Sequence, residues 1–145
     1  MKIHQISLFL ENKPGHLNAI CRTLAEAGIN IVTLSLADTQ QFGIVRLIVE
    51  EWQKAKEVLE KAGYVVNVRE VVAAAVADKP GGMAEILDII GKAGVNIEYM
   101  YAFAFRHGSE AVLVFRFDNA DRAIDVLKAS GHDVFDAVTL FTQKK

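Results

Sequence analysis

Two Pro-Gly turns stand out in this sequence for what their residue types could bind. Residues 12–15 read Asn-Lys-Pro-Gly, residues 78–81 read Asp-Lys-Pro-Gly, and a one-sided helical pattern follows each of them. Gly15 and Gly81 have no side chain, so backbone N–H groups at the opening of each helix can come close to a ligand. Helix N-termini favour a negative charge through their free donors and their dipole. The two turns are therefore candidate binding sites for a carboxylate.

The polar groups around the two turns differ. Asn12 offers both a donor and an acceptor, whereas an ionised Asp78 can only accept and suits an ammonium group or a capping role. His16 lies just inside the first helix, where the second turn has Gly82. A titratable ring therefore belongs to one site only. We expect the sites to be inequivalent and the first to be the more selective.

A purely structural role competes with this interpretation. Pro-Gly before a helix is common turn chemistry, and a single occurrence would favour structure alone. The repetition of the pair, together with a later Gly-(x)-Asn motif, shifts the balance towards a site. Asn30 and Asn96 in that motif can equally stabilise the turn that leaves the helix, and both interpretations stay open for them.

Other reactive side chains do not form a recognisable site. Cys21 falls on the apolar face of a helical pattern, where a buried structural thiol is expected. His4, His16, His107 and His132 lie far apart without helical i, i+4 pairing, so no metal site is predicted. No nucleophile stands near a base in a known pattern. We expect neither catalysis nor a cofactor.

Composition restricts the class of protein. The 145 residues are 52% hydrophobic and 23% charged with a net charge of −2, which is typical of a globular chain without a broad basic surface. We expect no nucleic-acid or membrane partner. The single cysteine excludes an intrachain disulfide, and the N-terminal residues lack the apolar run of a secretion signal. A cytoplasmic protein is expected.

The chain repeats itself. The Pro-Gly pairs and the motifs Gly28-Ile29-Asn30 and Gly94-Val95-Asn96 recur at a spacing of 66 residues, and the later helical pattern recurs at 68. The two extra residues fall in the polar stretches 38–42 and 106–110, where a hairpin connection is expected. We place the first module at residues 1–69 and the second at residues 70–145.

Each copy changes periodicity in the order strand, helix, strand, strand, helix, strand. This order predicts an α+β fold of two tandem ferredoxin-like βαββαβ modules, each with a four-stranded antiparallel sheet, packed together. The glycines Gly28, Gly63, Gly94 and Gly131 are expected to stop the helices. The predicted strands cover residues 6–10, 29–37, 44–49 and 64–68 in the first copy and 71–76, 95–105, 111–117 and 134–142 in the second.

Several strands are apolar at consecutive positions, which predicts that both faces of the sheets are covered. The sister module or a second chain is the simplest cover, so we expect a homodimer. One strand also carries an alternating aromatic row, formed by Tyr99, Tyr101, Phe103 and Phe105. This row is expected to pack an interface rather than to form a ligand cage. Arg46 and Arg116 could pair with acidic residues or face a ligand carboxylate.

The repeated Pro-Gly turn, helix and Gly-(x)-Asn motif resemble the ACT domain family over nearly the whole chain, as in a stand-alone tandem ACT protein. The resemblance implies amino-acid sensing, with the ligand held between modules by the turn after the first strand. Serine-sensing relatives have a histidine before the turn, where this chain has Leu10 and Val76, so serine is not expected. The candidate ligand-binding residues are Asn12, Lys13, Pro14, Gly15, His16, Leu17, Asn30, Ile31, Asp78, Lys79, Pro80, Gly81, Gly82, Met83, Asn96 and Ile97.

Two other functions use the same order of elements. RNA-binding modules stack bases on aromatic residues of their central strands, and this chain lacks that combination of basic and aromatic residues. The main alternative is a non-catalytic assembly subunit of an enzyme of amino-acid metabolism, with a degenerate pocket. An amino acid, a second copy of the chain and a metabolic enzyme are therefore the expected partners.

Overall fold

The computed structural model describes residues 1–39, 41–104 and 106–142. Its chain divides into two compact units. The first module comprises His4–Arg69, and the second comprises Glu70–Lys145 together with Met1–Ile3. Lys2, the second residue of the chain, accordingly lies within the second module, where its ammonium group is 3.1 Å from the carboxylate of Asp121.

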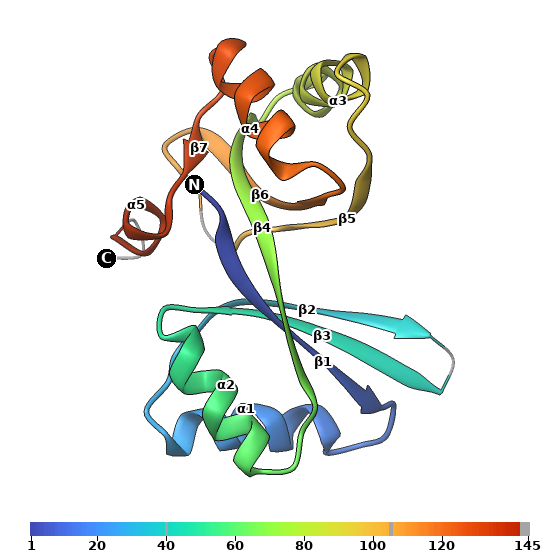
Figure 1. The fold of residues 1–145 in the computed structure, drawn as a ribbon, viewed down its shortest axis with the longest axis vertical. Helices are drawn as coiled ribbons and strands as arrows, with labels where there is room; N and C mark the ends of the chain where they lie inside the picture. Colours follow the sequence, from blue (N-terminus) through green and yellow to red (C-terminus); the bar gives the residue numbers. More distant parts are fainter. Residues whose placement is uncertain (40, 105, 143–145) are drawn as a thin grey trace. The chain divides into compact units, whose positions relative to one another are not determined.

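The first module places two helices on one face of its strands (Figure 1). Its strands follow the order β2-β3-β1-β4, and β3 pairs antiparallel with both β1 and β2. The elements are β1 (Ile3–Glu11), α1 (His16–Glu26), β2 (Ile31–Thr39), β3 (Phe42–Val49), α2 (Trp52–Lys61) and the beginning of β4 (Val66–Ala77).

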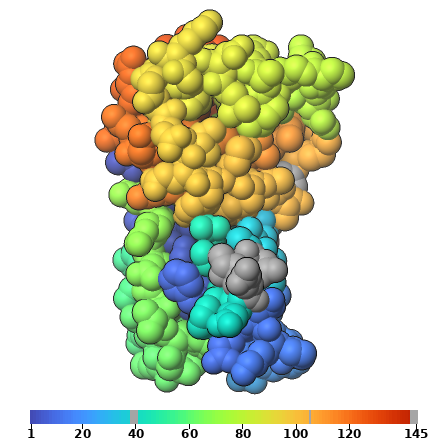
Figure 2. All heavy atoms as spheres, turned by 90° about the vertical axis from the view of Figure 1, so that its right-hand side faces the viewer, coloured from blue at the N-terminus to red at the C-terminus, as the bar shows by residue number. Residues whose placement is uncertain are grey.

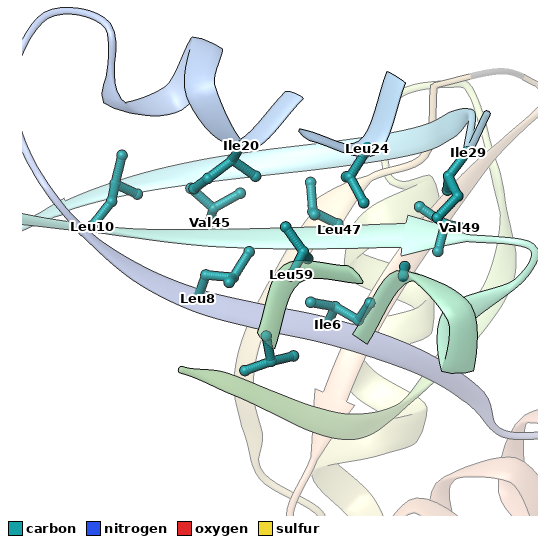
Figure 3. Close-up of a cluster of buried hydrophobic side chains, with 12 residues drawn as sticks. Ile6, Leu8, Leu10, Ile20, Leu24, Ile29, Val45, Leu47, Val49 and Leu59 are labelled. Atoms are coloured by element: carbon teal, nitrogen blue, oxygen red, sulfur yellow. The ribbon is translucent and has the colours of Figure 1, made fainter. Parts of the chain in front are cut away.

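The first core forms between these helices and the sheet. Alternate residues of β1 and β3 point towards the apolar faces of α1 and α2, as Figure 3 shows. Each such leucine or isoleucine removed from water contributes about 1.5–3 kcal/mol to folding. The labelled members of the cluster are Ile6, Leu8, Leu10, Ile20, Leu24, Ile29, Val45, Leu47, Val49 and Leu59.

The second module repeats the arrangement with a changed end. Its strands follow the order β4-β6-β5, and β7 pairs with the other side of β4. Residues of β5, in gold, lie at the molecular surface in Figure 2. The elements after β4 are α3 (Gly82–Lys92), β5 (Ile97–Ala102), β6 (Glu110–Phe117), α4 (Ala120–Ala129), β7 (Val134–Phe135) and α5 (Ala137–Thr142).

The predicted fold class is confirmed, because each module has the βαββαβ order with its helices on one face of an antiparallel sheet. The predicted helix stops are confirmed as well. Gly28, Gly63, Gly94 and Gly131 have φ values of 73°, 97°, 72° and 82°, in the left-handed region that glycine occupies at little cost.

Two strand predictions are wrong. The predicted strands 64–68 and 71–76 merge into the single strand β4, which begins only at Val66 and also contains Arg69 and Glu70. The strand predicted at 134–142 is only two residues long, and helix α5 follows it. The reason is Asp136, whose side chain accepts the backbone N–H of Thr139 at 2.7 Å and so caps the first turn of a helix.

Both faces of β4 are buried in the second module. Val72, Ala74 and Val76 join the core under the helices, and the alternate residues Val71 and Ala73 are fully buried too. For β4 this agrees with the expectation of a sheet covered on both sides, whereas Phe9 of β1 and Leu34 and Leu36 of β2 keep exposed apolar side chains.

The predicted aromatic row lies on the same face as the alternate residues of β4. Tyr101 pairs with Val114, which pairs with Ala73. Tyr99 and Tyr101 are half-buried and Phe103 is buried. Phe105, the last residue of the row, lies outside the described residues.

Within the described part of the chain, every helix is too short or too polar to span a bilayer.

Candidate functional site

The turn between β1 and α1 is tightly bonded to its surroundings. The backbone N–H of Asn12 donates to the carbonyl of Gln41 at 3.0 Å, and that of His16 donates to the carbonyl of Lys13 at 3.3 Å. Gly15 has a φ of 88° at the N-cap, with no side-chain cap for the helix. A glycine therefore opens the helix, as the sequence predicts, and leaves the first turn of backbone donors without a side-chain acceptor.

A carboxylate and an ammonium group stand together at this turn. Lys13 Nζ lies 2.9 Å from Glu11 Oε2. The hydrogen bond from Lys13 lowers the pKa of the Glu11 carboxyl below its usual value, and the same bond raises the pKa of Lys13. Glu11 is therefore ionised at neutral pH and can accept hydrogen bonds from a cationic ligand group.

A hollow of about 400 Å³ opens beside the turn. It is within the size range of sites for small molecules, about 300–1,000 Å³. His16 and Tyr64 line it as half-buried polar side chains, and apolar side chains supply much of the rest. The lining residues are Phe9, Leu10, Glu11, His16, Ala19 and Tyr64.

Of the residues predicted for the site, His16 lines this hollow. Asn12, Lys13, Pro14 and Gly15 lie in the adjoining turn and are exposed. Sequence reasoning missed the other lining residues. Glu11 could have been suspected from its place directly before the turn, whereas Tyr64 is 48 positions further along the chain than His16 and only the fold brings it here.

The second Pro-Gly turn has the same backbone but different side-chain partners. Gly81 has a φ of 85° at the N-cap, and the N–H of Gly82 donates to the carbonyl of Lys79 at 3.0 Å. Asp78 Oδ2 lies 2.6 Å from a guanidinium nitrogen of Arg106, with both side chains about half exposed. The carboxylate that the sequence offered to a ligand ammonium group is therefore paired with an arginine of this module.

The Gly-(x)-Asn motifs lie away from the Pro-Gly turns of their own modules. Asn30 and Ile31 follow the C-terminal end of α1, and an 11-residue helix is about 16 Å long. Asn96 has a backbone role: its N–H donates to Asp118 Oδ1 at 2.9 Å and its carbonyl accepts the N–H of Asp118 at 3.1 Å. Within one module, then, the structure does not join the two predicted groups, and Ile97 continues from Asn96 into β5.

Arg116, which could have faced a ligand carboxylate, is bonded within the second module. Arg116 Nε lies 3.6 Å from Glu98 Oε1, and its guanidinium donates to the carbonyl of Glu70 at 2.8 Å. Cys21 was expected to be a buried thiol, but it is only half-buried. Met83, predicted beside the second turn, packs half-buried against the second core. Among the described residues no group of histidine, cysteine and carboxylate side chains is arranged to hold a metal ion.

A second depression, of about 380 Å³, runs along the exposed side of α2. Its charged side chains satisfy one another: Lys56 lies 2.8 Å from Glu60, and Lys61 lies 3.3 Å from Glu57. Such exposed i, i+4 pairs belong to a solvated helix surface. The hollow at the first Pro-Gly turn is the better candidate site.

Repeat, fold and turn geometry define a chain of two ferredoxin-like modules that each present a glycine-opened helix after the first strand. The family model of the ACT domain pair matches residues 1–142. The chain belongs to this family.

Solved structures share the fold. The chain is similar to a protein of Bacteroides thetaiotaomicron, with 39% identity, 94% of each chain covered and a TM-score of 0.87. It is also similar to the ligand-free regulatory subunit of aspartate kinase from Thermus thermophilus, with 21% identity, 88% of this chain and 90% of that chain covered, and a TM-score of 0.66. The regulatory subunit of aspartate kinase from Thermus flavus follows at 20% identity, with coverages of 89% and 93% and a TM-score of 0.62.

At identities of 20–21% the likeness to the two Thermus proteins concerns the fold. A comparison with functionally curated proteins gave no match.

Proposed function

We propose that this protein is a regulatory ACT domain pair that binds an amino acid beside its strand-to-helix Pro-Gly turns and catalyses no reaction. The observation that carries the proposal is the hollow of about 400 Å³ beside the first of these turns, in a chain that belongs to the ACT domain pair family. The hollow combines the Glu11 carboxylate, the polar side chains of His16 and Tyr64, and apolar walls. An amino acid needs such a mixture, because it carries an ammonium group, a carboxylate and a side chain.

The turn itself supports a carboxylate contact. Gly15 is exposed, and a Cβ built on it would meet no atom within 4 Å. The backbone can therefore be approached from solvent at the point where the helix begins. The helix dipole favours a negative group there. A ligand position between modules, which the family resemblance implies, remains a prediction.

A regulatory protein without chemistry of its own acts through a partner. Regulatory subunits of aspartate kinase have the same fold, and we propose an enzyme of amino-acid metabolism as the partner of this chain. Ligand binding would then change the affinity for that enzyme, and the enzyme would change the affinity for the ligand by the same factor.

Thermal unfolding of the full chain against each of the twenty amino acids at millimolar concentration tests the proposal. A ligand that binds the folded chain raises its stability by RT ln(1 + [L]/Kd), which is about 2.7 kcal/mol when the ligand concentration is 100 times Kd. At least one amino acid is expected to raise the Tm. If none does, the assembly-subunit alternative becomes the better account.

The two glycines that flank α1 make a matched pair for this experiment. Gly15 and Gly28 both have positive φ, 88° and 73°, and a Cβ on either would meet no atom within 4 Å. Valine at either position strains the backbone to a similar degree, but only Gly15→Val alters the proposed site. We expect Gly15→Val to abolish the ligand-induced shift and Gly28→Val to retain it. Gly81→Val applies the same test to the second turn.

We also propose a homodimer in the cytoplasm. Apolar side chains of β1, β2 and β3 that stay exposed in the single chain support the dimer, since monomers rarely expose large contiguous apolar patches; they are Phe9, Leu34, Leu36 and Phe42. Light scattering coupled to gel filtration would measure the mass directly, and a mass of one chain, 15.9 kDa, at micromolar concentration would contradict the proposal.

A further inference from the structure

The two modules differ at two aligned positions that border the first-module hollow. Ala19 and Glu85 are each the fourth residue of the helix that follows a Pro-Gly turn. Tyr64 and His132 each follow the second helix, and each donates its backbone N–H to the carbonyl of the leucine five residues earlier, at 3.1 and 2.9 Å. The backbone therefore places these pairs alike, and only their side chains differ.

In the second module this pair of positions carries side chains that meet. His132 Nε2 lies 4.0 Å from Glu85 Oε1, and the His132 side chain is only 14% exposed. The first module has the methyl group of Ala19 and the phenol of Tyr64 instead, and both line the hollow. The second module thus has a carboxylate, 60% exposed, and an imidazole at the two positions where the first module has Ala19 and Tyr64 beside its hollow.

The third difference is at the first residue of the helix. His16 supplies an imidazole to the hollow, whereas its counterpart is Gly82, which is buried. A Cβ on Gly82 would collide with the carbonyl oxygen of Ala77, a backbone atom that cannot move aside cheaply. No side chain fits there, so the second module cannot offer a polar ring at this place.

The chemistry of the first-module hollow specifies a ligand. The Glu11 carboxylate can accept hydrogen bonds from an ammonium group, and His16 and Tyr64 can each donate one to a carboxylate. Leu10 and Ala19 leave an apolar wall for the remainder of the ligand. A small zwitterion with an apolar side chain satisfies all of these groups, whereas a second charge on the ligand would face no partner among them.

We propose that the first-module hollow is the amino-acid site of this chain, that it takes an amino acid with an apolar side chain, and that Glu85 and His132 close the corresponding place in the second module. This rests on the proposed function, and it adds the class of ligand and the module that holds it. One ligand binds per chain.

Calorimetric titration of the full chain with leucine, phenylalanine, serine and aspartate tests ligand class and stoichiometry. Leucine or phenylalanine is expected to bind with one site per chain and at least about tenfold more tightly than serine or aspartate, a difference of about 1.4 kcal/mol. Tighter binding of serine or aspartate would overturn the ligand class. If none of these four binds but another of the twenty amino acids raises the Tm, the ligand class is overturned; if none of the twenty does, the proposed function itself fails.

Filling the hollow tests its location. Ala19 is exposed and lines the hollow, so Ala19→Trp fills it without touching the core. Ala25→Trp is the matched control, because Ala25 is also exposed on α1 and does not line the hollow. We expect Ala19→Trp to weaken binding at least about tenfold and Ala25→Trp to leave it unchanged. Unchanged binding in Ala19→Trp would overturn the location.

Exchange of the closing residues tests the difference between modules. The double variant Ala19→Glu, Tyr64→His gives the first module the residues of the second and is expected to abolish binding. The reciprocal variant Glu85→Ala, His132→Tyr is expected to leave affinity and the single ligand per chain unchanged. Binding that is lost only in the reciprocal variant would place the site in the second module. Circular dichroism verifies folding, and if Tyr64→His unfolds the chain, Ala19→Trp decides alone.

Discussion

The two Pro-Gly turns share a backbone and its hydrogen bonds but differ in the ion pairs of their side chains. Gly15 and Gly81 have φ values of 88° and 85°, and both modules pack an apolar cluster beneath their helices. At the first turn the nearby carboxylate of Glu11 pairs with Lys13 inside the turn. At the second, Asp78 pairs with Arg106 from the hairpin.

This difference shows that a duplicated fold can keep its structural residues while its sites diverge. The core residues are constrained by packing, since an interior at crystal-like density tolerates little change in volume. Residues at the rim of the turn have no such constraint. One copy can therefore carry Ala19 and Tyr64 beside its hollow while the other carries Glu85 and His132 at the matching positions.

The largest effects are expected in the cores, where the modules should behave alike. Leu59 and Leu127 hold matching positions on α2 and α4, and both are fully buried. Leu59→Ala and Leu127→Ala should each lower the free energy of unfolding by about 2–5 kcal/mol, because each leaves a cavity. Urea unfolding measures both. A cost below about 1 kcal/mol for either would show that the two cores are not equivalent.

The next largest effect on stability is expected at the first residue of α3, where the two modules differ. Gly82→Ala forces a methyl group against the Ala77 carbonyl and should cost about 1–3 kcal/mol of stability. Gly91→Ala is the control on the same helix, since a Cβ there meets no atom within 4 Å, and it should stabilise by about 0.4–1 kcal/mol. His16→Ala, the first-module counterpart, should change stability little. A neutral Gly82→Ala would contradict the close packing.

A smaller effect concerns the pH dependence of ligand binding. The hydrogen bond from Lys13 lowers the pKa of Glu11, so the ionised carboxylate persists as the pH falls, and ligand affinity should be lost only below the usual carboxyl range. Lys13→Gln removes this bond and raises the pKa of Glu11 towards its ordinary value. The pH below which ligand affinity is lost should then be higher than in the unaltered chain.

Lys79→Gln is the matched control for that experiment, because the second module has Ala77 where the first has Glu11. Lys79→Gln should lose ligand affinity at the same pH as the unaltered chain. Titration with leucine between pH 3 and 7 measures both variants. If Lys13→Gln loses affinity at the same pH as the unaltered chain, Glu11 does not contact the ligand.

The smallest effect is confined to α5, which the first module lacks. Asp136 accepts the backbone N–H of Thr139, and this bond lowers the pKa of the carboxyl. Its stabilising contribution is therefore complete above the ordinary carboxyl pKa and is lost as the pH falls through the lowered folded-state pKa. Asp136→Ala should speed hydrogen exchange of the α5 amides at neutral pH.

Asp133→Ala is the control for this last variant, since the backbone carbonyl of Asp133 keeps its 2.9 Å bond to the N–H of Ala75. It should leave the exchange of α5 unchanged. Equal exchange rates in the two variants would show that the Asp136 side chain does not stabilise the helix.

Much of the fold followed from local patterns. The apolar spacing of α1 and α3 and the glycines that stop the helices predicted the order of elements, because each of these signals lies within a few residues of chain. The repeat at 66 residues extended the same order to the second copy. The capping role of Asp136 was also local, but the apolar residues after it suggested a strand. One side-chain hydrogen bond decided in favour of a helix there.

The candidate site, too, could be predicted only in part from the sequence. The two Pro-Gly turns, their glycines and the presence of His16 in one copy only could be read along the chain, since these depend on neighbouring residues. It took the folded structure to place Tyr64 in the lining of the hollow, Glu85 near His132 and Gly82 against Ala77. These contacts depend on how helices pack on strands, and periodicity specifies which face of an element is buried without specifying which distant residue it meets.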